Sequence, residues 1–151
     1  METILVSACL LGDNVKYNGG NNYDQRIEAL KEIYDIVPIC PEVFGGLTTP
    51  RIPSEIKNGE VINQEGKNVT ENFRIGAHNV LNIVNYLHIK KAVLMDRSPS
   101  CGVRHIYNGR FNQTLIDGQG ICAKLLKQHG VEIYTIDEID SLLKEGHKHE
   151  N

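Results

Sequence analysis

The sequence predicts an α/β fold with three layers, in which a mostly parallel sheet has helices on both faces and small β-hairpin insertions. Four short runs of β-branched and apolar residues have the length and composition of strands. Helical patterns separate these runs, and this alternation favours a parallel sheet because parallel strands need helical crossovers. With 151 residues, 40% of them hydrophobic, the chain has the usual size of one domain. We expect one α/β domain over residues 1–146 and a loose tail over residues 147–151.

The first half of the chain opens with a β-branched, apolar run at residues 3–8, which has the length of a strand. A helix is expected over residues 24–34, because Asp24 can act as its N-cap and apolar residues recur at helical spacing. A second strand-length run occupies residues 36–39. Residues 61–69 are interpreted as a small hairpin that turns at Gln-Glu-Gly-Lys.

The strongest helical pattern covers residues 70–88, where apolar residues recur every three or four positions and Thr70 can cap the first turn. Asn108 and Gly109 predict the turn of a second hairpin, over residues 105–114. Two further strand-length runs follow the same pattern as the first, at residues 91–95 and 131–134. Two further helical patterns are present, at residues 120–129, with Gly130 as a stop, and at residues 137–145.

The net charge of −3 disfavours nucleic acid as the main partner, because binding to phosphates needs a concentration of Lys and Arg that this chain lacks. The first residues carry Glu2 where a signal peptide would carry a base, and their apolar run is too short to span a membrane. We therefore expect a cytoplasmic protein without a membrane partner. Its cysteines are then expected to be thiols, catalysts or metal ligands and not disulfides. The sequence leaves open whether the chain forms a homo-oligomer.

Three cysteines follow three of the expected strands. Cys9 comes after the first strand, Cys40 after the second, and Cys101 in the loop after the third. The carboxyl ends of parallel strands form one ligand-binding edge, so residues 31 and 61 positions apart in sequence can converge there. Cys122 falls inside an expected helix, so for this cysteine we expect plain packing in the core.

Three thiols at a sheet edge could hold zinc, hold an iron–sulfur cluster, or act as a nucleophile with a resolving partner. A structural zinc site usually contains Cys-x-x-Cys pairs, which this chain lacks, although His105 could supply a fourth ligand. A phosphate-binding Cys-x5-Arg loop and the spacing of ferredoxins are also absent from the sequence. The pattern therefore fits best a cluster that is held by three cysteines and has one iron free.

The same segments carry a family resemblance. The sequence reads Ser-Ala-Cys-Leu-Leu-Gly at residues 7–12, Cys-Pro-Glu-Val at 40–43, Gly-Gly-Leu-Thr-Thr-Pro-Arg-Ile-Pro-Ser-Glu at 45–55, and Arg-Ser-Pro-Ser-Cys-Gly at 97–102. In these motifs the chain resembles the 2-thiouracil desulfurase family, long catalogued as a domain of unknown function. The resemblance implies a four-iron, four-sulfur cluster on Cys9, Cys40 and Cys101, which can be lost in air. It also implies a non-redox desulfuration of a thiolated heterocycle or a related small thio-compound, with release of sulfide.

Such a reaction needs groups that move protons. Glu42, two residues after Cys40, and Ser98 and Ser100, just before Cys101, are the candidates. Glu42 could instead be a surface or helix-capping acid, and the serines could form turns beside Pro99. Met95 stands in a segment where family members often carry a lysine, so any role for a lysine there is in doubt. Arg104 and His105 replace small residues, which could change the pocket mouth and the substrate.

Arg51 and Arg97 are candidates for binding the substrate's carbonyl or an anion, although an arginine in a Pro-rich loop could equally tie backbone carbonyls together. Gly118, Gly120 and Ala123 match a dinucleotide fingerprint, but they come late in the chain, which favours a plain helix start. Two alternatives to a desulfurase remain: a carrier of a cluster or of sulfur that has no turnover, and a metal-free thiol enzyme that works through Cys9 or Cys101.

Overall fold

A four-stranded parallel sheet forms the centre of the protein. The computed structural model describes the backbone of residues 1–150 and the side chains of residues 1–146. The strands are hydrogen-bonded in the order β2-β1-β5-β8, and every pair is parallel. All four predicted strands are confirmed, with ends shifted by at most two residues: β1 (Thr3–Ser7), β2 (Asp35–Ile39), β5 (Lys91–Val93) and β8 (Glu132–Tyr134).

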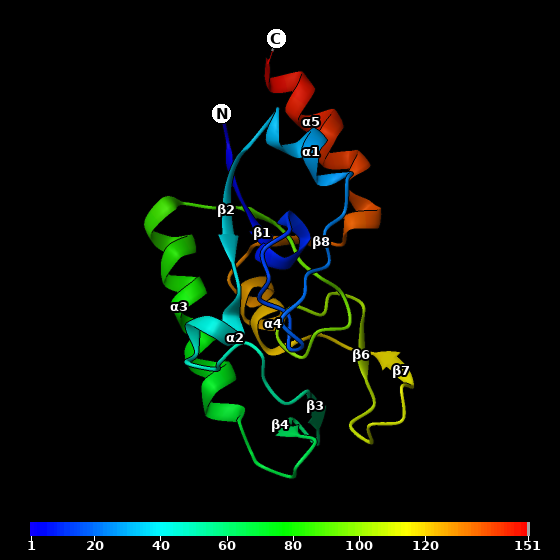
Figure 1. Ribbon diagram of the computed structural model, residues 1–151. Coiled ribbons are helices and arrows are strands. Elements are labelled where there is room, and N and C mark those ends of the chain that lie inside the picture. Colours follow the sequence, from blue (N-terminus) through cyan, green and yellow to red (C-terminus); the bar gives the residue numbers. More distant parts are fainter. Residues whose placement is uncertain (151) are drawn as a thin grey trace.

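Helices cover both faces of this sheet, which confirms the predicted three-layer α/β fold. Successive residues of β1 point to opposite faces, as the pleat requires. Leu5 packs in the apolar cluster that contains residues of α3 (Thr70–Leu87) and α4 (Ile121–Gln128), whereas Ile4 and Val6 pack in the cluster on the other face. That second cluster contains residues of α1 (Ile27–Lys31) and α5 (Asp140–Glu150). Figure 1 shows α3 and the α1–α5 pair on different sides of the strands.

Two antiparallel hairpins are inserted into the fold, and both differ from the prediction in register. The first pairs β3 (Ser54–Lys57) with β4 (Glu60–Asn63) through a turn at Asn58 and Gly59. The prediction of a hairpin over residues 61–69 is therefore wrong, because residues 60–63 pair with β3 and not with the residues that follow them. The predicted turn connects only an isolated β-bridge between Ile62 and Asn68. The second hairpin pairs β6 (His105–Tyr107) with β7 (Leu115–Asp117), so its second strand begins after the predicted end at Thr114.

Two predicted helix caps are wrong because their side chains have other partners. Asp24 is not the N-cap of α1, which begins only at Ile27, and its carboxylate instead accepts hydrogen bonds from the backbone and guanidinium of Arg26. Thr70 is the first residue of α3 and is buried, and its hydroxyl accepts the N–H of Val61 at 2.8 Å. This bond joins the start of α3 to β4.

Helix α5 continues through Gly146 to Glu150, so the predicted helix end before Gly146 is wrong. A Cβ at Gly146 would overlap the side chain of Ile33. The glycine therefore permits close packing on the residues after α1 and does not end the helix. Asn151, the last residue of the predicted tail, lies outside the described residues. No helix in residues 1–150 combines the length and apolar character needed to cross a membrane.

The short helix α2 (Pro41–Phe44) lies directly against the backbone of α3. A Cβ at Gly76 would overlap the carbonyl oxygen of Pro41, and a Cβ at Gly45 would overlap that of Asn72. The Asn72 side chain also donates to the carbonyl of Gly45 at 2.9 Å. Two glycines therefore fix the position of the helix that follows Cys40.

Replacing Gly76 with Ala should destabilise the protein by about 2 kcal/mol or more, because the new methyl group has no room beside Pro41. At an exposed helix position a change from Gly to Ala would stabilise the protein by up to about 1 kcal/mol, so the expected change in unfolding free energy at Gly76 has the opposite sign. Urea unfolding measures the difference. The adjacent, half-exposed Ile75 provides the control, since Ile75→Ala should change stability by only about 0.5 kcal/mol. A stabilised Gly76→Ala variant would contradict the close packing of α2 on α3.

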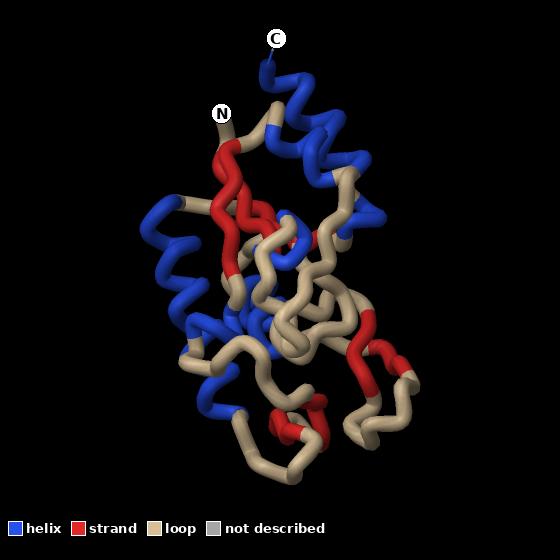
Figure 2. Tube along the Cα trace, viewed as in Figure 1, coloured by secondary structure: helices blue, strands red, loops and turns tan. Residues whose placement is uncertain are grey.

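The loops that follow the strands gather at the carboxyl edge of the sheet, between the sheet and the two hairpins (Figure 2). The N-terminus and the last turns of α5 lie at the opposite end of the molecule (Figure 1). The chain passes from β1 to β2 on one side and later to β5 on the other side. This reversal is a topological switch point, which in open α/β sheets is the place where ligands bind.

Candidate functional site

The three predicted cysteines lie at the carboxyl ends of three adjacent strands. Cys9 is in a short 3-10 helix (Ala8–Leu11) that follows β1, and Cys40 is the residue before α2. Cys101 lies in the loop after β5 and is buried, whereas Cys9 and Cys40 are partly exposed. Because β1 lies between β2 and β5, the structure brings all three residues to one edge at the switch point.

The negative charge of Glu42 affects the pKa of all three cysteine thiols at this edge. Burial is the largest cause that raises the pKa of each of the three thiols, and the negative charge of Glu42 raises each of them further. Cys9 also raises the pKa of Cys40. The charge of Glu42 therefore acts on all three thiols. No three Cys, His, Asp or Glu side chains within the described residues lie close enough to share a single metal ion.

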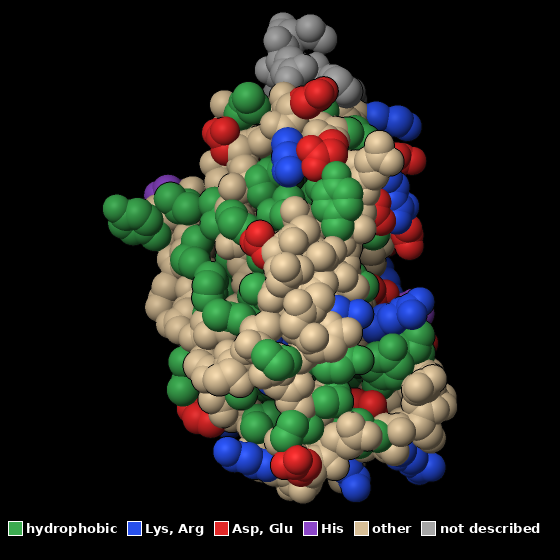
Figure 3. Space-filling view, viewed as in Figure 1, with side chains coloured by type: hydrophobic (Ala, Val, Ile, Leu, Met, Phe, Trp, Pro, Cys, Tyr) green, Lys and Arg blue, Asp and Glu red, His purple; other side chains and the backbone are tan. Residues whose placement is uncertain are grey.

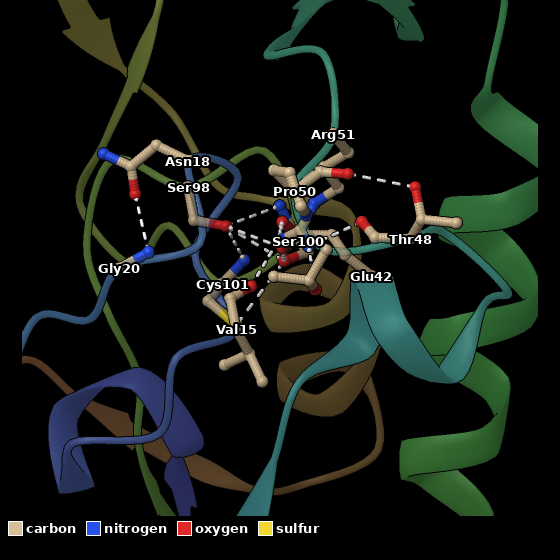
Figure 4. Close-up of polar contacts among 11 residues, drawn as sticks. Val15, Asn18, Gly20, Glu42, Thr48, Pro50, Arg51, Ser98, Ser100 and Cys101 are labelled. Carbon is tan, nitrogen blue, oxygen red and sulfur yellow. Dashed lines mark hydrogen bonds and ion pairs between the residues drawn. The ribbon is translucent and has the colours of Figure 1, made fainter.

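Glu42 is held by an arginine on one side and by two serines on the other (Figure 4). Its Oε2 lies 2.7 Å from Nη2 of Arg51, and the two side chains are only 14% and 9% exposed. Its Oε1 accepts hydrogen bonds from the hydroxyls of Ser98, at 3.3 Å, and of Ser100. The structure thus brings together four of the predicted site residues, and Glu42 is neither a surface carboxylate nor a cap that bonds its own helix.

The two serines also shape the loop that carries Cys101. The hydroxyl of Ser98 accepts the backbone N–H groups of Ser100 and Cys101, each at 3.1 Å. Ser100 is fully buried, and its hydroxyl lies 3.6 Å from the Cys101 sulfur. Ser98 therefore forms the turn, as the alternative interpretation predicted, and both hydroxyls also contact the Glu42 carboxylate.

The first turn of α4 holds the loop that carries Cys101 through backbone hydrogen bonds. The N–H groups of Ile121 and Cys122 donate to the carbonyls of Pro99 and Ser100, each at 2.9 Å. A Cβ at Gly120 would overlap the backbone of Ser100, so a glycine is required where the loop and the helix meet. Gly120 is thus the N-cap of α4, which begins at Ile121, and this agrees with the interpretation as a plain helix start.

Cys122 itself packs in the core, as predicted. It is fully buried in the apolar cluster between the sheet and α3, together with Ala123 and Leu126. Burial, followed by the charge of Glu42, raises the pKa of Cys122 to about 12. It lies within a helix and not in a loop at the strand ends.

Two polar residues at the site were not predicted from the sequence. Against the larger effect of burial, a hydrogen bond from Asn22 lowers the pKa of Cys9, and one from Ser7 lowers that of Cys101. The buried Ser7 also accepts the N–H of Met95 at 2.9 Å, across the β1–β5 pair. Ser7 stands in the first motif and could have been found there, whereas no sequence signal marks Asn22.

Asp96 closes the Cys101 loop at its base. Its Oδ1 accepts the backbone N–H groups of Val103, Arg104 and His105, at 2.9 to 3.0 Å, and its Oδ2 lies 3.0 Å from Nδ1 of His105. Burial alone would raise the pKa of Asp96, but these hydrogen bonds outweigh burial and lower it to about 2. The His105 ring contacts Asp96 through Nδ1. Within the described residues no group of three potential metal ligands includes His105, so its role as a fourth zinc ligand has no support from the structure.

Replacing Asp96 with Asn should lower stability at neutral pH by about 1 to 2 kcal/mol. The folded-state pKa is depressed, so the stabilisation is present above about pH 4 and is lost as the pH falls toward 2. The difference between wild type and variant should therefore shrink over that range in urea unfolding. Asp117→Asn, at a fully exposed carboxylate, is the control. A difference that does not depend on pH would contradict this role.

Arg97 lies apart from the Glu42 network. Its side chain is exposed, its backbone has a φ of 74°, and its N–H donates to the carbonyl of His105 at 3.1 Å. Its predicted contact with substrate stays a prediction. An open recess of about 640 Å³ borders Arg51 instead, and its lining includes Tyr17, Asn18 and Gln64.

Comparisons with known proteins agree with this arrangement. The family model described as 2-thiouracil desulfurase matches residues 4–138. An uncharacterized protein of Bacillus subtilis strain 168, YbbK, is 36% identical over 150 residues, which cover 93% of this chain and 99% of that protein. A solved structure described as the 4Fe-4S-dependent thiouracil desulfidase TudS is 39% identical, with a TM-score of 0.89 over 94% of this chain and 95% of that chain. The predicted resemblance is confirmed, and the chain belongs to the 2-thiouracil desulfurase family.

Proposed function

We propose that the protein is a desulfurase that binds a four-iron, four-sulfur cluster and removes sulfur from a thiolated heterocycle or a related small thio-compound. The observation that carries this proposal is the position of Cys9, Cys40 and Cys101 on adjacent strand ends around Glu42. The likeness to a thiouracil desulfidase supports the same reaction and the same cofactor.

The donor set fits a cluster with one iron free of protein. Cys9, Cys40 and Cys101 would be its ligands, since thiolates are the usual ligands of iron–sulfur clusters. Cys122 shares a buried cluster with Cys101, but it lies within α4 and not in a loop after a strand, so it would not join them. When bound, such a cluster would supply a Lewis-acidic iron with affinity for the soft sulfur of a thiocarbonyl.

The reaction exchanges one sulfur for one oxygen without electron transfer. Water and 2-thiouracil give uracil and hydrogen sulfide, so water must lose protons and the departing sulfur must gain them. In our proposal Glu42 accepts a proton at its carboxylate, and the hydroxyls of Ser98 and Ser100 pass protons to and from Oε1. The buried position of Ser100 keeps bulk water from competing for that hydrogen bond.

Anaerobic reconstitution with iron and sulfide tests the proposal directly. We expect about four irons and four sulfides per chain, and release of sulfide together with uracil from 2-thiouracil. A protein that binds the cluster but turns over no thiolated base would instead be a carrier. A colourless protein that is fully active in chelator would be a thiol enzyme, an alternative that the raised pKa values of all three thiols disfavour because the thiolate is the reactive form.

The proposal also covers the domain organisation, the cellular compartment and the partners of the enzyme. We propose that residues 1–146 act as one domain in the cytoplasm on a small thiolated substrate, and that the chain can form a homo-oligomer. Charges of both signs are interspersed on the face drawn in Figure 3. This distribution, with the net charge of −3, supports a small molecule over nucleic acid as the partner.

A further inference from the structure

The guanidinium of Arg51 is nearly saturated by contacts within the protein (Figure 4). Its Nη2 donates to Glu42 Oε2 at 2.7 Å and to the carbonyl of Val15 at 2.8 Å. Its Nη1 donates to the carbonyl of Thr48 at 3.3 Å and to the hydroxyl of Thr49 at 3.1 Å. Four of the five N–H donors of the side chain are thus used, and little capacity is left for a substrate.

These contacts join segments that adjoin all three cysteines in the sequence. Val15 belongs to the loop after Cys9, and Glu42 lies in the helix that begins after Cys40. Through Glu42, the connection extends to Ser98 and Ser100 in the Cys101 loop. The backbone N–H of Arg51 also donates to the carbonyl of Tyr17 at 2.7 Å, which fixes the same loop a second time.

We infer that Arg51 is a positioning residue that acts through Glu42 and does not bind the substrate. This inference rests on the proposed function, and of the two roles that the sequence left open for Arg51 it favours the tying of backbone carbonyls over contact with substrate. A carboxylate held at Oε2 by a fixed cation keeps Oε1 directed at the two serine hydroxyls. Without the cation, Glu42 is free to rotate and loses the only cationic partner that the described contacts give it.

The effect on turnover should fall on kcat. Misplacing a reacting group by about 1 Å can cost about 100-fold in rate, so Arg51→Gln should lower kcat by about 10- to 100-fold. The KM should stay close to that of the wild type, because the guanidinium does not contact substrate. Arg51→Lys keeps one charge beside Glu42 but cannot reach all four acceptors, so it should retain an intermediate kcat.

A double-mutant cycle separates action through Glu42 from a direct role. Arg51→Gln, Glu42→Gln and the double variant are compared anaerobically with 2-thiouracil, and the iron content of each is measured. We expect Arg51→Gln to cost nothing further when Glu42→Gln is already present. The exposed Arg26, paired with Asp24 and Asp137, is the matched control, and Arg26→Gln should leave kcat and KM unchanged. A raised KM with unchanged kcat in Arg51→Gln, or additive losses, would overturn the inference.

Urea unfolding of the wild type, the two single variants Arg51→Gln and Glu42→Gln, and the double variant gives a readout that does not depend on activity. If the pair acts as a unit, the double variant should lower the unfolding midpoint by less than the sum of the two single changes. A wild-type protein that releases no sulfide would refute the proposed function alone. Additive shifts in the midpoint would refute the pairing of Arg51 with Glu42, whether or not the protein is an active desulfurase.

Discussion

Replacing Glu42 with Gln should lower the rate of sulfide release by about 100- to 10,000-fold, the range typical for loss of a general acid or base. Glutamine has nearly the same shape and can still contact the serine hydroxyls, but it cannot take up a proton. The change removes proton transfer and leaves the three cysteines in place. Turnover of 2-thiouracil by reconstituted protein, divided by its iron content, measures the effect.

The control for this prediction is a carboxylate with similar partners but no place in the site. Glu28 is an exposed residue with 48% of its side chain accessible, and it contacts Lys31 and Tyr23 at 3.0 and 2.9 Å. Glu28→Gln should therefore retain the wild-type rate. A Glu42→Gln variant with nearly full activity would remove Glu42 from the chemistry and would leave it a role in loop structure alone.

Replacing Cys101 with Ala should abolish stable binding of the cluster, so that iron per reconstituted chain falls to the background level. Two remaining thiolates would leave two irons without protein ligands. Cys122→Ala is the matched control, because both cysteines are buried and each change removes one sulfur from the interior. Only Cys101 lies at the strand ends, so the Cys122→Ala protein should keep its iron and its absorption spectrum.

Packing losses are common to both cysteine variants, and they should therefore appear as similar decreases in unfolding stability, about 1 to 2 kcal/mol each. The cluster content is what distinguishes them. Equal loss of iron from the two variants would show that burial, and not ligation, explains the effect. Retention of iron by Cys101→Ala would remove this residue from the ligand set.

The sheet and the placement of the cysteines could be predicted because both depend on local sequence. The apolar run that becomes β1 is clear, and a residue just after a parallel strand has only one edge on which to lie. The first hairpin was paired wrongly because Gln-Glu-Gly-Lys resembles a turn as well as Asn58-Gly59 does. Only the tertiary position of β3 decides between them.

The sequence identifies the residues of the Glu42 network as site candidates, but it does not predict the contacts between them. Arg51, Glu42 and Ser100 come from three segments whose meeting depends on how loops fold over the sheet edge, and loop paths have no periodic signal. The helix caps failed for a related reason. Thr70 has the right chemistry for a cap, but a backbone N–H of β4 takes its hydroxyl.

The contact between α4 and the Cys101 loop has a consequence for the order of events during synthesis. Cys9 and Cys40, together with β1 and β2, leave the ribosome early in synthesis because they lie in the first 40 residues. The third thiol reaches its place only after residues 120–123 have emerged and formed the first turn that holds the carbonyls of Pro99 and Ser100. A nascent chain that ends before this turn would have Cys9 and Cys40 in place, but its Cys101 loop would lack the hydrogen bonds from α4. Cofactor insertion would thus be confined to chains in which β1, β2 and β5 and the first turn of α4 are already in place, whereas β8 could still be missing from the sheet.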